Sequence, residues 1–205
     1  MQTPSVSIDC YINRDDAEHE DALQSVLAAG LPEQVAERTL QAAGIDGPEG
    51  ALQSYNLSLV ITGDDEIQAL NRQYRQQDKP TDVLSFPLLD RPLVVAPTDQ
   101  LWPPSEGEQG EDGGSEEVKG SEARPKFITP TELSTNLGDI VISWPTTARQ
   151  AALAGHQPVY ELLYLLSHGI LHLVGYDDQS EAGYEAMVRI QETVMRQVAW
   201  ESSTG

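Results

Sequence analysis

Two histidines in an otherwise apolar segment are the residues of this chain most able to do chemistry. His168 and His172 stand four positions apart in PVYELLYLLSHGILHLVGYDD, which runs from Pro158 to Asp178. Apolar residues lie nearly all round this segment until Gly175, which predicts a buried helix with both imidazoles on one face. A buried imidazole is costly unless its ring nitrogens find partners. The spacing therefore predicts a metal site, with two hydrogen-bonded core histidines as the alternative.

Strands and helices that would position this segment are mixed along the chain. Alternating or continuous apolar residues predict four strands, at Ser5–Ile12, Tyr55–Ile61, Thr81–Phe86 and Leu137–Ser143. Helical spacing and capping residues predict helices at about 19–29, 32–43, 63–74, 145–154, 158–175 and 180–199. This mixture predicts an α/β (α+β) fold, with one small four-stranded mixed sheet packed by helices. The metal-candidate helix would be its central element.

The chain from about Leu88 to Ser134 has a different composition. It is rich in proline, glycine and acids, and it contains EGEQGEDGGSEEVKGSE. Such a sequence buries too little apolar surface to offset the entropy that is lost on ordering. We therefore predict a long disordered acidic insertion at about 88–134, within a single domain of residues 1–205. An acidic docking segment is the alternative for this stretch.

The composition narrows the class of protein. The 205 residues include one cysteine, Cys10, which excludes an intramolecular disulfide framework and agrees with a reducing, cytoplasmic setting. The first ten residues, MQTPSVSIDC, lack the basic and apolar regions of a secretory signal. The most apolar stretch is too short to span a membrane. We expect a soluble cytoplasmic protein without a membrane partner.

Charge is distributed unevenly along the chain. The net charge of −21, from 33 acidic and 12 basic residues, argues on its own against a phosphate-binding surface. Acids concentrate near the N-terminus and between Glu106 and Glu122, whereas bases cluster between Arg72 and Lys79. An anionic substrate would therefore meet the chain at the basic cluster.

Three blocks of this sequence resemble one known family. His168-Gly-Ile-Leu-His172-Leu-Val-Gly-Tyr-Asp177 resembles the H-G-x-L-H-L-x-G-Y-D-H signature of the YbeY endoribonuclease (rRNA maturation factor) family. The blocks LNRQYR at 70–75 with DKPTDVLSFP at 78–87, and LGDIVIS at 137–143, are also present in the family's order. The resemblance covers most of residues 55–199.

The resemblance implies a fold, an activity and partners. The fold is small and α/β, with one zinc ion per chain held by three histidines of the signature. The activity that it implies is that of a single-strand-specific, metal-dependent endoribonuclease in ribosomal RNA maturation, including processing of the 3′ end of small-subunit rRNA, and in ribosome quality control. The partners are single-stranded RNA, ribosomal RNA or the small ribosomal subunit, and not DNA.

The resemblance also assigns the metal ligands, with one departure from the family. His168 and His172 match the first two ligands, and Asp178 stands where the family has its third histidine. Two histidines and one carboxylate are a known catalytic zinc arrangement that leaves a position open for water. We expect Asp178 to be the third ligand and Asp177 to orient a ligand imidazole. The alternatives are ligation by Asp177 or a degenerate site with poor metal affinity.

Arg75 is the predicted phosphate-binding residue, with Arg72 and Lys79 beside it. A guanidinium makes a two-pronged contact with a phosphate and stabilises charge that develops at phosphorus. The alternative is a solvated helix end, where a basic residue suits the helix dipole. The resemblance favours phosphate binding and gives Arg75 a catalytic role together with His168 and His172.

Two other functions compete with RNA hydrolysis. Zinc proteases also bind metal through His-x-x-x-His on a helix, but they need a glutamate after the first histidine, where this chain has Gly169. A non-catalytic ribosome-associated factor with a structural metal is the second alternative. If the acidic stretch from Glu106 to Glu122 covered Arg75, it would act as an autoinhibitory mimic of RNA.

Overall fold

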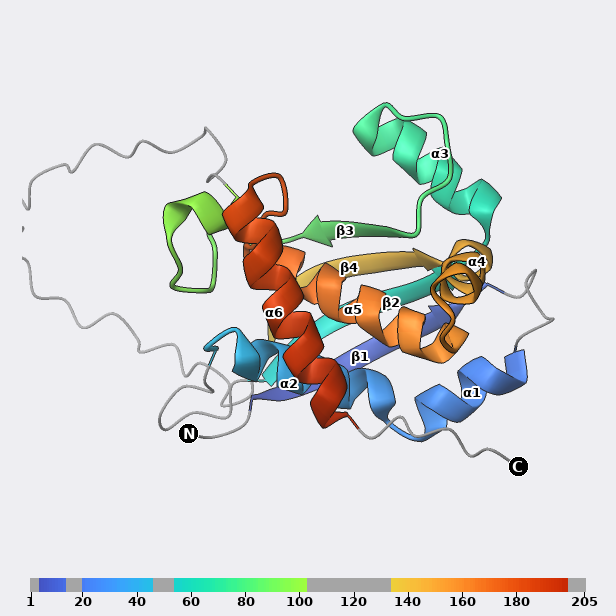
Figure 1. The fold of residues 1–205 in the computed structure, drawn as a ribbon, viewed down its shortest axis with the longest axis horizontal. Coiled ribbons are helices and arrows are strands. Elements are labelled where there is room, and N and C mark those ends of the chain that lie inside the picture. Colours follow the sequence, from blue (N-terminus) through green and yellow to red (C-terminus); the bar gives the residue numbers. More distant parts are fainter. Residues whose placement is uncertain (1–3, 14–19, 46–53, 103–133, 199–205) are drawn as a thin grey trace, which may run out of the picture.

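The computed structural model describes residues 4–13, 20–45, 54–102 and 134–198. Within these ranges, helices pack on the two faces of one sheet (Figure 1). The elements follow one another as β1 (Ser5–Ile12), α1 (Glu20–Ala28), α2 (Leu31–Ala42), β2 (Ser54–Thr62), α3 (Asp64–Arg75), β3 (Val83–Pro87), the short 3₁₀ turn η2 (Thr98–Gln100), β4 (Thr135–Ser143), α4 (Trp144–Ala154), α5 (Pro158–Val174) and α6 (Glu181–Gln197).

The sheet has four strands in the order β1-β2-β4-β3. β1 pairs in parallel with β2, and β2 in parallel with β4, whereas β3 is antiparallel to β4. The predicted α/β fold with a small mixed sheet is therefore confirmed. β3 begins at Val83 and not at Thr81, because the Asp82 carboxylate accepts hydrogen bonds from Val83 N and Thr81 Oγ1 and holds a turn there.

Alternation along β2 and β4 directs one set of side chains to the main core and the other to the opposite face. Leu57, Leu59 and Ile61 of β2 are buried in the main core. In β4, Ile140 and Ile142 join this core, while Val141 between them packs in a second cluster with Ile67 and Leu84. Each face of the sheet therefore has its own helices.

α5 is the central helix, as predicted. It packs against α2, α4 and α6 as well as β3 and β4, and crosses the sheet in Figure 1. A Cβ atom on Gly169 would lie 2.9 Å from Cδ1 of Ile140, so the glycine lets α5 lie directly on β4. Gly175 ends the helix in a left-handed conformation with φ of 116°. No helix within the described ranges combines the length and apolarity needed to cross a membrane.

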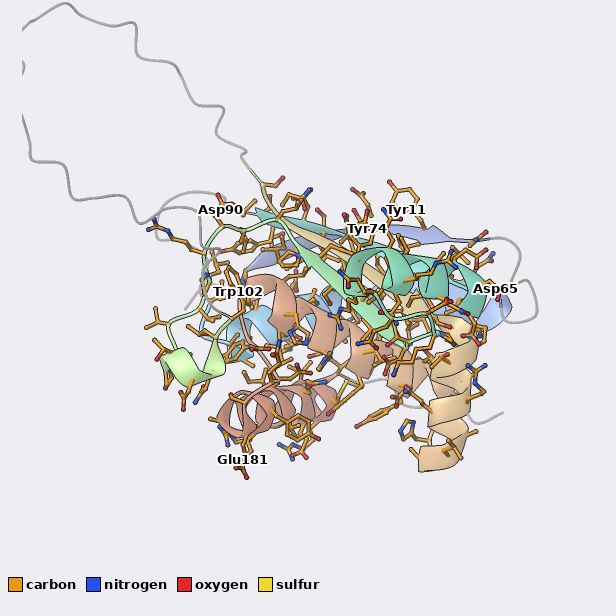
Figure 2. All side chains as sticks on the ribbon, turned by 90° about the horizontal axis from the view of Figure 1, so that it is seen from above. Tyr11, Asp65, Tyr74, Asp90, Trp102 and Glu181 are labelled. Atoms are coloured by element: carbon orange, nitrogen blue, oxygen red, sulfur yellow. The ribbon has the colours of Figure 1, made fainter. Side chains whose placement is uncertain are left out.

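α3 lies on the other face and carries Arg75 at its last position. Ile67 anchors this helix in the second cluster, and the ring of Tyr74 meets the ring of Phe86 edge-on, with centroids 5.1 Å apart. Figure 2 shows Tyr74 on the side of the molecule away from Glu181, the first residue of α6. These contacts hold the end of α3 over β3.

The predicted start of the insertion, at about residue 88, is wrong. Residues 88–102 are placed against the fold: Leu88 N donates to Leu137 O at 3.1 Å, Leu93 N donates to Val174 O at 2.8 Å, and Val94 is buried. Backbone hydrogen bonds to β4 and to the end of α5, together with apolar side chains that pack on the core, thus hold a stretch for which the sequence predicts disorder. Residues 103–133, with the acidic stretch from Glu106 to Glu122, lie outside the described residues.

Asp64, at the start of α3, ties this helix to the junction of β4 and α4. Its carboxylate accepts hydrogen bonds from Ser143 Oγ at 2.5 Å, Thr146 Oγ1 at 2.7 Å and Arg149 Nη2 at 2.7 Å. Burial alone would raise the pKa of Asp64, but these three hydrogen bonds outweigh it and lower that pKa.

We predict that Asp64→Asn lowers the free energy of unfolding at pH 7 by about 1–3 kcal/mol, because an ionised acceptor is lost from three hydrogen bonds. A lowered folded-state pKa stabilises the fold above the unfolded pKa of about 3.9, and this contribution is lost as pH falls through the folded-state value. The difference from wild type should therefore shrink towards pH 3 in urea denaturation. Asp65→Asn, at an exposed position of the same turn, is the matched control. An equal loss in both variants would contradict the prediction.

Candidate metal centre

The three predicted metal ligands converge in the structure. His168 Nε2 lies 3.0 Å from His172 Nε2, and Asp178 Oδ2 lies 3.6 Å from the former and 3.7 Å from the latter. A circle through these three atoms has a radius of about 2.0 Å, which matches the length of zinc–nitrogen and zinc–oxygen bonds. The three donors therefore lie close enough together for one ion of zinc's size to contact all of them.

The two imidazoles are held by the helix and by the turn that follows it. Their ring planes are inclined at 84° with centroids 4.6 Å apart. The Nδ1 atom of His172 lies 3.0 Å from the carbonyl oxygen of Tyr176, so an Nδ1–H donated there leaves Nε2 free to bind metal. The side chains of His168 and His172 are 22% and 20% exposed, and that of Asp178 is 39% exposed. The group thus opens to solvent on one side, as a catalytic metal requires.

Asp177 does not make the orienting contact that the sequence analysis expects of it. Its Oδ1 accepts a hydrogen bond from Gln179 N at 3.3 Å, and its N–H donates to Gln100 O at 3.0 Å. The carbonyl of Tyr176 takes the orienting position, because the turn at Gly175 brings that carbonyl back to the end of the helix.

The electrostatics favour the protonation states that a metal needs. Burial lowers the pKa of His168, and the neighbouring His172 lowers it further, while Asp178 opposes both effects. Interaction with the His172 imidazole lowers the pKa of Asp178 to about 2, against the opposing effect of burial. At neutral pH, His168 is therefore neutral and Asp178 is ionised, ready to coordinate a cation.

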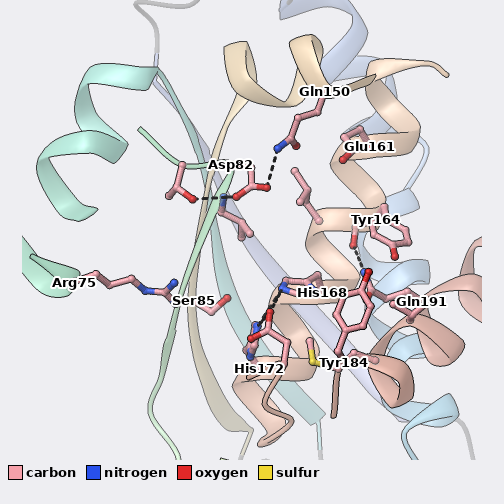
Figure 3. A pocket seen from close by; sticks show the side chains of 16 residues that line it. Arg75, Asp82, Ser85, Gln150, Glu161, Tyr164, His168, His172, Tyr184 and Gln191 are labelled. Atoms are coloured by element: carbon pink, nitrogen blue, oxygen red, sulfur yellow. Dashed lines mark hydrogen bonds and ion pairs between the residues drawn. The ribbon is translucent and has the colours of Figure 1, made fainter. Parts of the chain in front are cut away.

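These residues lie on one wall of a cavity of about 430 Å³ (Figure 3). Arg75 reaches the cavity from α3 and extends over Ser85 of β3, on the side opposite α5. The exposed ring of Tyr184 and the side chain of Met187, both on α6, contribute to a third wall. The cavity therefore combines a guanidinium, a set of candidate metal ligands and an aromatic surface.

Of the three predicted basic residues, the structure brings one to the cavity. Arg75 lines it, whereas Arg72 and Lys79 do not. Arg72 Nη1 lies 3.8 Å from Asp78 Oδ1 at the surface, and the carbonyl of Lys79 accepts a hydrogen bond from Asn71 Nδ2 at 2.9 Å. The side chains of Arg72 and Lys79 are exposed beside the end of α3.

Sequence reasoning missed the wall on the α6 side. Gln191 is buried and donates through Nε2 to Tyr164 O at 3.3 Å, and Tyr184 is 57% exposed at the rim. Tyr184, Met187 and Gln191 recur at helical spacing, so they share one face of α6. A polar glutamine on an otherwise apolar face is the signal that could have directed attention there.

Comparison with known proteins decides the family. The family model described as "Endoribonuclease YbeY" matches residues 18–199. The chain belongs to the YbeY family.

Relatives from this YbeY family cover most of the chain. A protein of Dehalococcoides mccartyi named "Endoribonuclease YbeY" is 34% identical over 85% of this chain and 90% of its own length. One from Moorella thermoacetica with the same name is 34% identical over 92% of this chain and 96% of its own. A third protein of this name, from Synechocystis, is 39% identical over 67% of this chain and 60% of its own length. A solved structure from Thermotoga maritima aligns over 97% of this chain and 99% of its own, at 21% identity and with a TM-score of 0.46.

We predict that this YbeY-family chain binds one zinc ion and that Asp178→Ala loses most of that affinity, because one of three converging ligands is removed. Asp178→His should retain zinc, since it supplies an imidazole at the same position. Metal content after dialysis and chelator competition measure both. Asp177→Ala, at the neighbouring carboxylate that bonds Gln179 N, is the control. Zinc retained in full by Asp178→Ala would show that Asp178 is not a ligand.

Proposed function

We propose that this protein is a metal-dependent endoribonuclease that cleaves single-stranded RNA during ribosomal RNA maturation, including the 3′ end of small-subunit rRNA, and in ribosome quality control. His168, His172 and Asp178 hold one zinc ion. The observation that carries the proposal is that these ligands share a cavity with Arg75 in a chain of the YbeY family. Curated relatives named as endoribonucleases support RNA as the substrate class.

The two sides of the cavity suit a phosphodiester. A bound zinc would activate a water molecule or polarise the scissile phosphate. Arg75, facing the ligands across the cavity, holds the phosphate through two parallel N–H donors and stabilises the negative charge that develops on it. Arg72 and Lys79, exposed beside it, contact the backbone of flanking nucleotides.

The carboxylates that line the cavity do not neutralise the positive charge that Arg75 offers to a phosphate. The Asp82 carboxylate is engaged by Thr81, Val83 N and Gln150 Nε2. Glu161 lies 3.1 Å from His156 Nε2, and burial raises the pKa of this carboxyl. Both acids therefore have partners within the protein, which reduces their repulsion of a phosphate.

Gly169 argues against the alternative of a zinc protease. Its missing Cβ would point at Ile140 of β4, so a glutamate at this position would face the core and not the cavity. The position used by such proteases for their general base is thus closed in this fold.

We predict that the zinc-loaded protein cleaves single-stranded RNA and leaves casein intact. A chelator and His172→Ala should each abolish cleavage, because both remove the metal. Fragment patterns on a labelled RNA provide the measurement, and circular dichroism checks that His172→Ala is folded. Cleavage that survives chelation, or that is unchanged in His172→Ala, would refute the proposal. Zinc binding without cleavage would support the non-catalytic alternative.

Arg75→Ala should lower kcat by about 100–1,000-fold, since a donor to the charge of the transition state is lost. Arg72→Ala, one turn earlier on α3, should instead raise KM a few-fold and reduce the salt dependence of binding, because it removes a contact to the flanking backbone. Steady-state kinetics at two salt concentrations separate the two effects. Equal changes in kcat for both variants would contradict the assignment of Arg75.

A further inference from the structure

Residues 97–102, called the strap here, run alongside the loop that carries Asp178. Trp102 N donates to Gly175 O at 2.9 Å, and Asp177 N donates to Gln100 O at 3.0 Å. Between these two hydrogen bonds, Leu101 pairs with Tyr176 in an antiparallel bridge. Figure 2 shows Trp102 at the same end of the molecule as Glu181, where α6 begins.

Contacts on either side of the bridge extend this attachment. Leu93 N donates to Val174 O at 2.8 Å, and a Cβ on Gly175 would lie 2.6 Å from Cβ of Pro92, so the preceding segment touches the end of α5. At the other end, Ser180 Oγ donates to the carbonyl of Asp99. The loop between α5 and α6 is therefore held by the same upstream segment from its first residue to its last.

The loop divides its contacts between the strap and the metal ligands. Gly175 and Asp177 bond to the strap through their backbone. Tyr176 and Asp178 serve the metal site: the Tyr176 carbonyl holds His172 Nδ1 at 3.0 Å, and Asp178 Oδ2 lies within 3.7 Å of both histidine Nε2 atoms. In an antiparallel bridge of this kind, the central residue makes no hydrogen bond to its partner, which leaves the Tyr176 carbonyl free for the imidazole.

We infer that the strap is a positioning element of the metal centre, and that its docking on the loop and the binding of zinc are thermodynamically linked. The inference rests on the proposed metal site. Asp178 is 39% exposed, so its own packing does little to restrict it. The strap fixes the backbone of the loop that carries this carboxylate. Less conformational entropy is then lost when Asp178 is ordered on metal binding. Linkage is reciprocal. If docking of the strap strengthens zinc binding by some factor, bound zinc must strengthen docking of the strap by the same factor.

Two substitutions at Trp102 isolate the decisive hydrogen bond. Trp102→Pro removes the N–H that donates to Gly175 O, whereas Trp102→Ala loses the same indole and keeps that N–H. Leu101 has φ of −113° and ψ of 147°, an extended conformation that tolerates a following proline. We expect Trp102→Pro to bind zinc about tenfold more weakly than Trp102→Ala, the loss typical when a group that orients a metal ligand is removed.

Cobalt(II) adds a readout that a merely structural role would not change. Visible absorption of cobalt(II) reports the number and geometry of its ligands. Trp102→Pro should show a weakened or shifted spectrum at saturating cobalt(II), while Trp102→Ala should match wild type. Equal zinc affinities and identical cobalt spectra in the two variants would overturn the inference.

Hydrogen exchange of the wild-type protein tests the linkage even if Trp102→Pro fails to fold. Zinc should slow exchange of the Trp102 and Asp177 amides, and it should leave unchanged the amide of Asn13, which donates to Ile61 O at the far edge of the sheet. The effect should vanish in His172→Ala. Zinc binding without slower exchange at Trp102 and Asp177 would overturn the strap inference alone. A wild-type protein that binds no zinc would overturn the metal site as well.

Discussion

The burial of α5 is the constraint on which the rest of the structure depends. Leu163, Leu166 and Ile170 are fully buried, and Gly169 brings the helix against Ile140 of β4. A helix packed in this way has no freedom to rotate, because any rotation would expose apolar residues or drive a side chain into the sheet. The one side that remains open is the side on which the two histidines stand, so the cavity and the helix orientation are consequences of the same packing.

The parts of the fold that the sequence predicted correctly are those with local signals. Alternating apolar residues revealed β2, and the apolar run around His168 and His172 revealed the central helix α5, on which both histidines stand. Residues 88–102 were misjudged for two reasons. Their apolar residues, such as Leu93 and Val94, were averaged with the acidic stretch that follows, and their backbone hydrogen bonds join segments that are remote in sequence. Backbone groups are the same in every residue, so such pairings have no signature in composition.

The residues of the site likewise divide into those that a sequence pattern marks and those whose role depends on the fold. Asp178 was a candidate ligand from sequence because it stands where the family signature has its third histidine, and the structure places its Oδ2 within 3.7 Å of both histidine Nε2 atoms. The Tyr176 carbonyl could not be predicted, since its role depends on the geometry of the turn and not on the tyrosine side chain. The family resemblance already singles out Arg75 among the three nearby cations. The direction of α3 over β3 gives the physical reason why Arg75 lines the cavity whereas Arg72 and Lys79 do not.

Net charge describes this molecule poorly, because function depends on where charges lie. A chain of net charge −21 still presents Arg75 opposite the candidate metal ligands, and the nearby Asp82 carboxylate accepts hydrogen bonds from Thr81 and Gln150. A carboxylate as third ligand would leave a zinc site with one less positive charge than three imidazoles would. The acidic stretch from Glu106 to Glu122 lies outside the described residues, and its role as an RNA mimic over Arg75 stays a conditional hypothesis.

The antiparallel pairing of β3 with β4 has a consequence for how this architecture can vary. Leu88 and Leu137 are hydrogen-bonded neighbours at the ends of the two strands, which a hairpin of almost any length could join. Gain or loss of chain beyond Trp102 therefore leaves the strand order untouched. Within the same connection, however, residues 92–102 brace the metal loop. A change of chain length in this connection can therefore alter the support of the loop that carries Asp178 without altering the strand order.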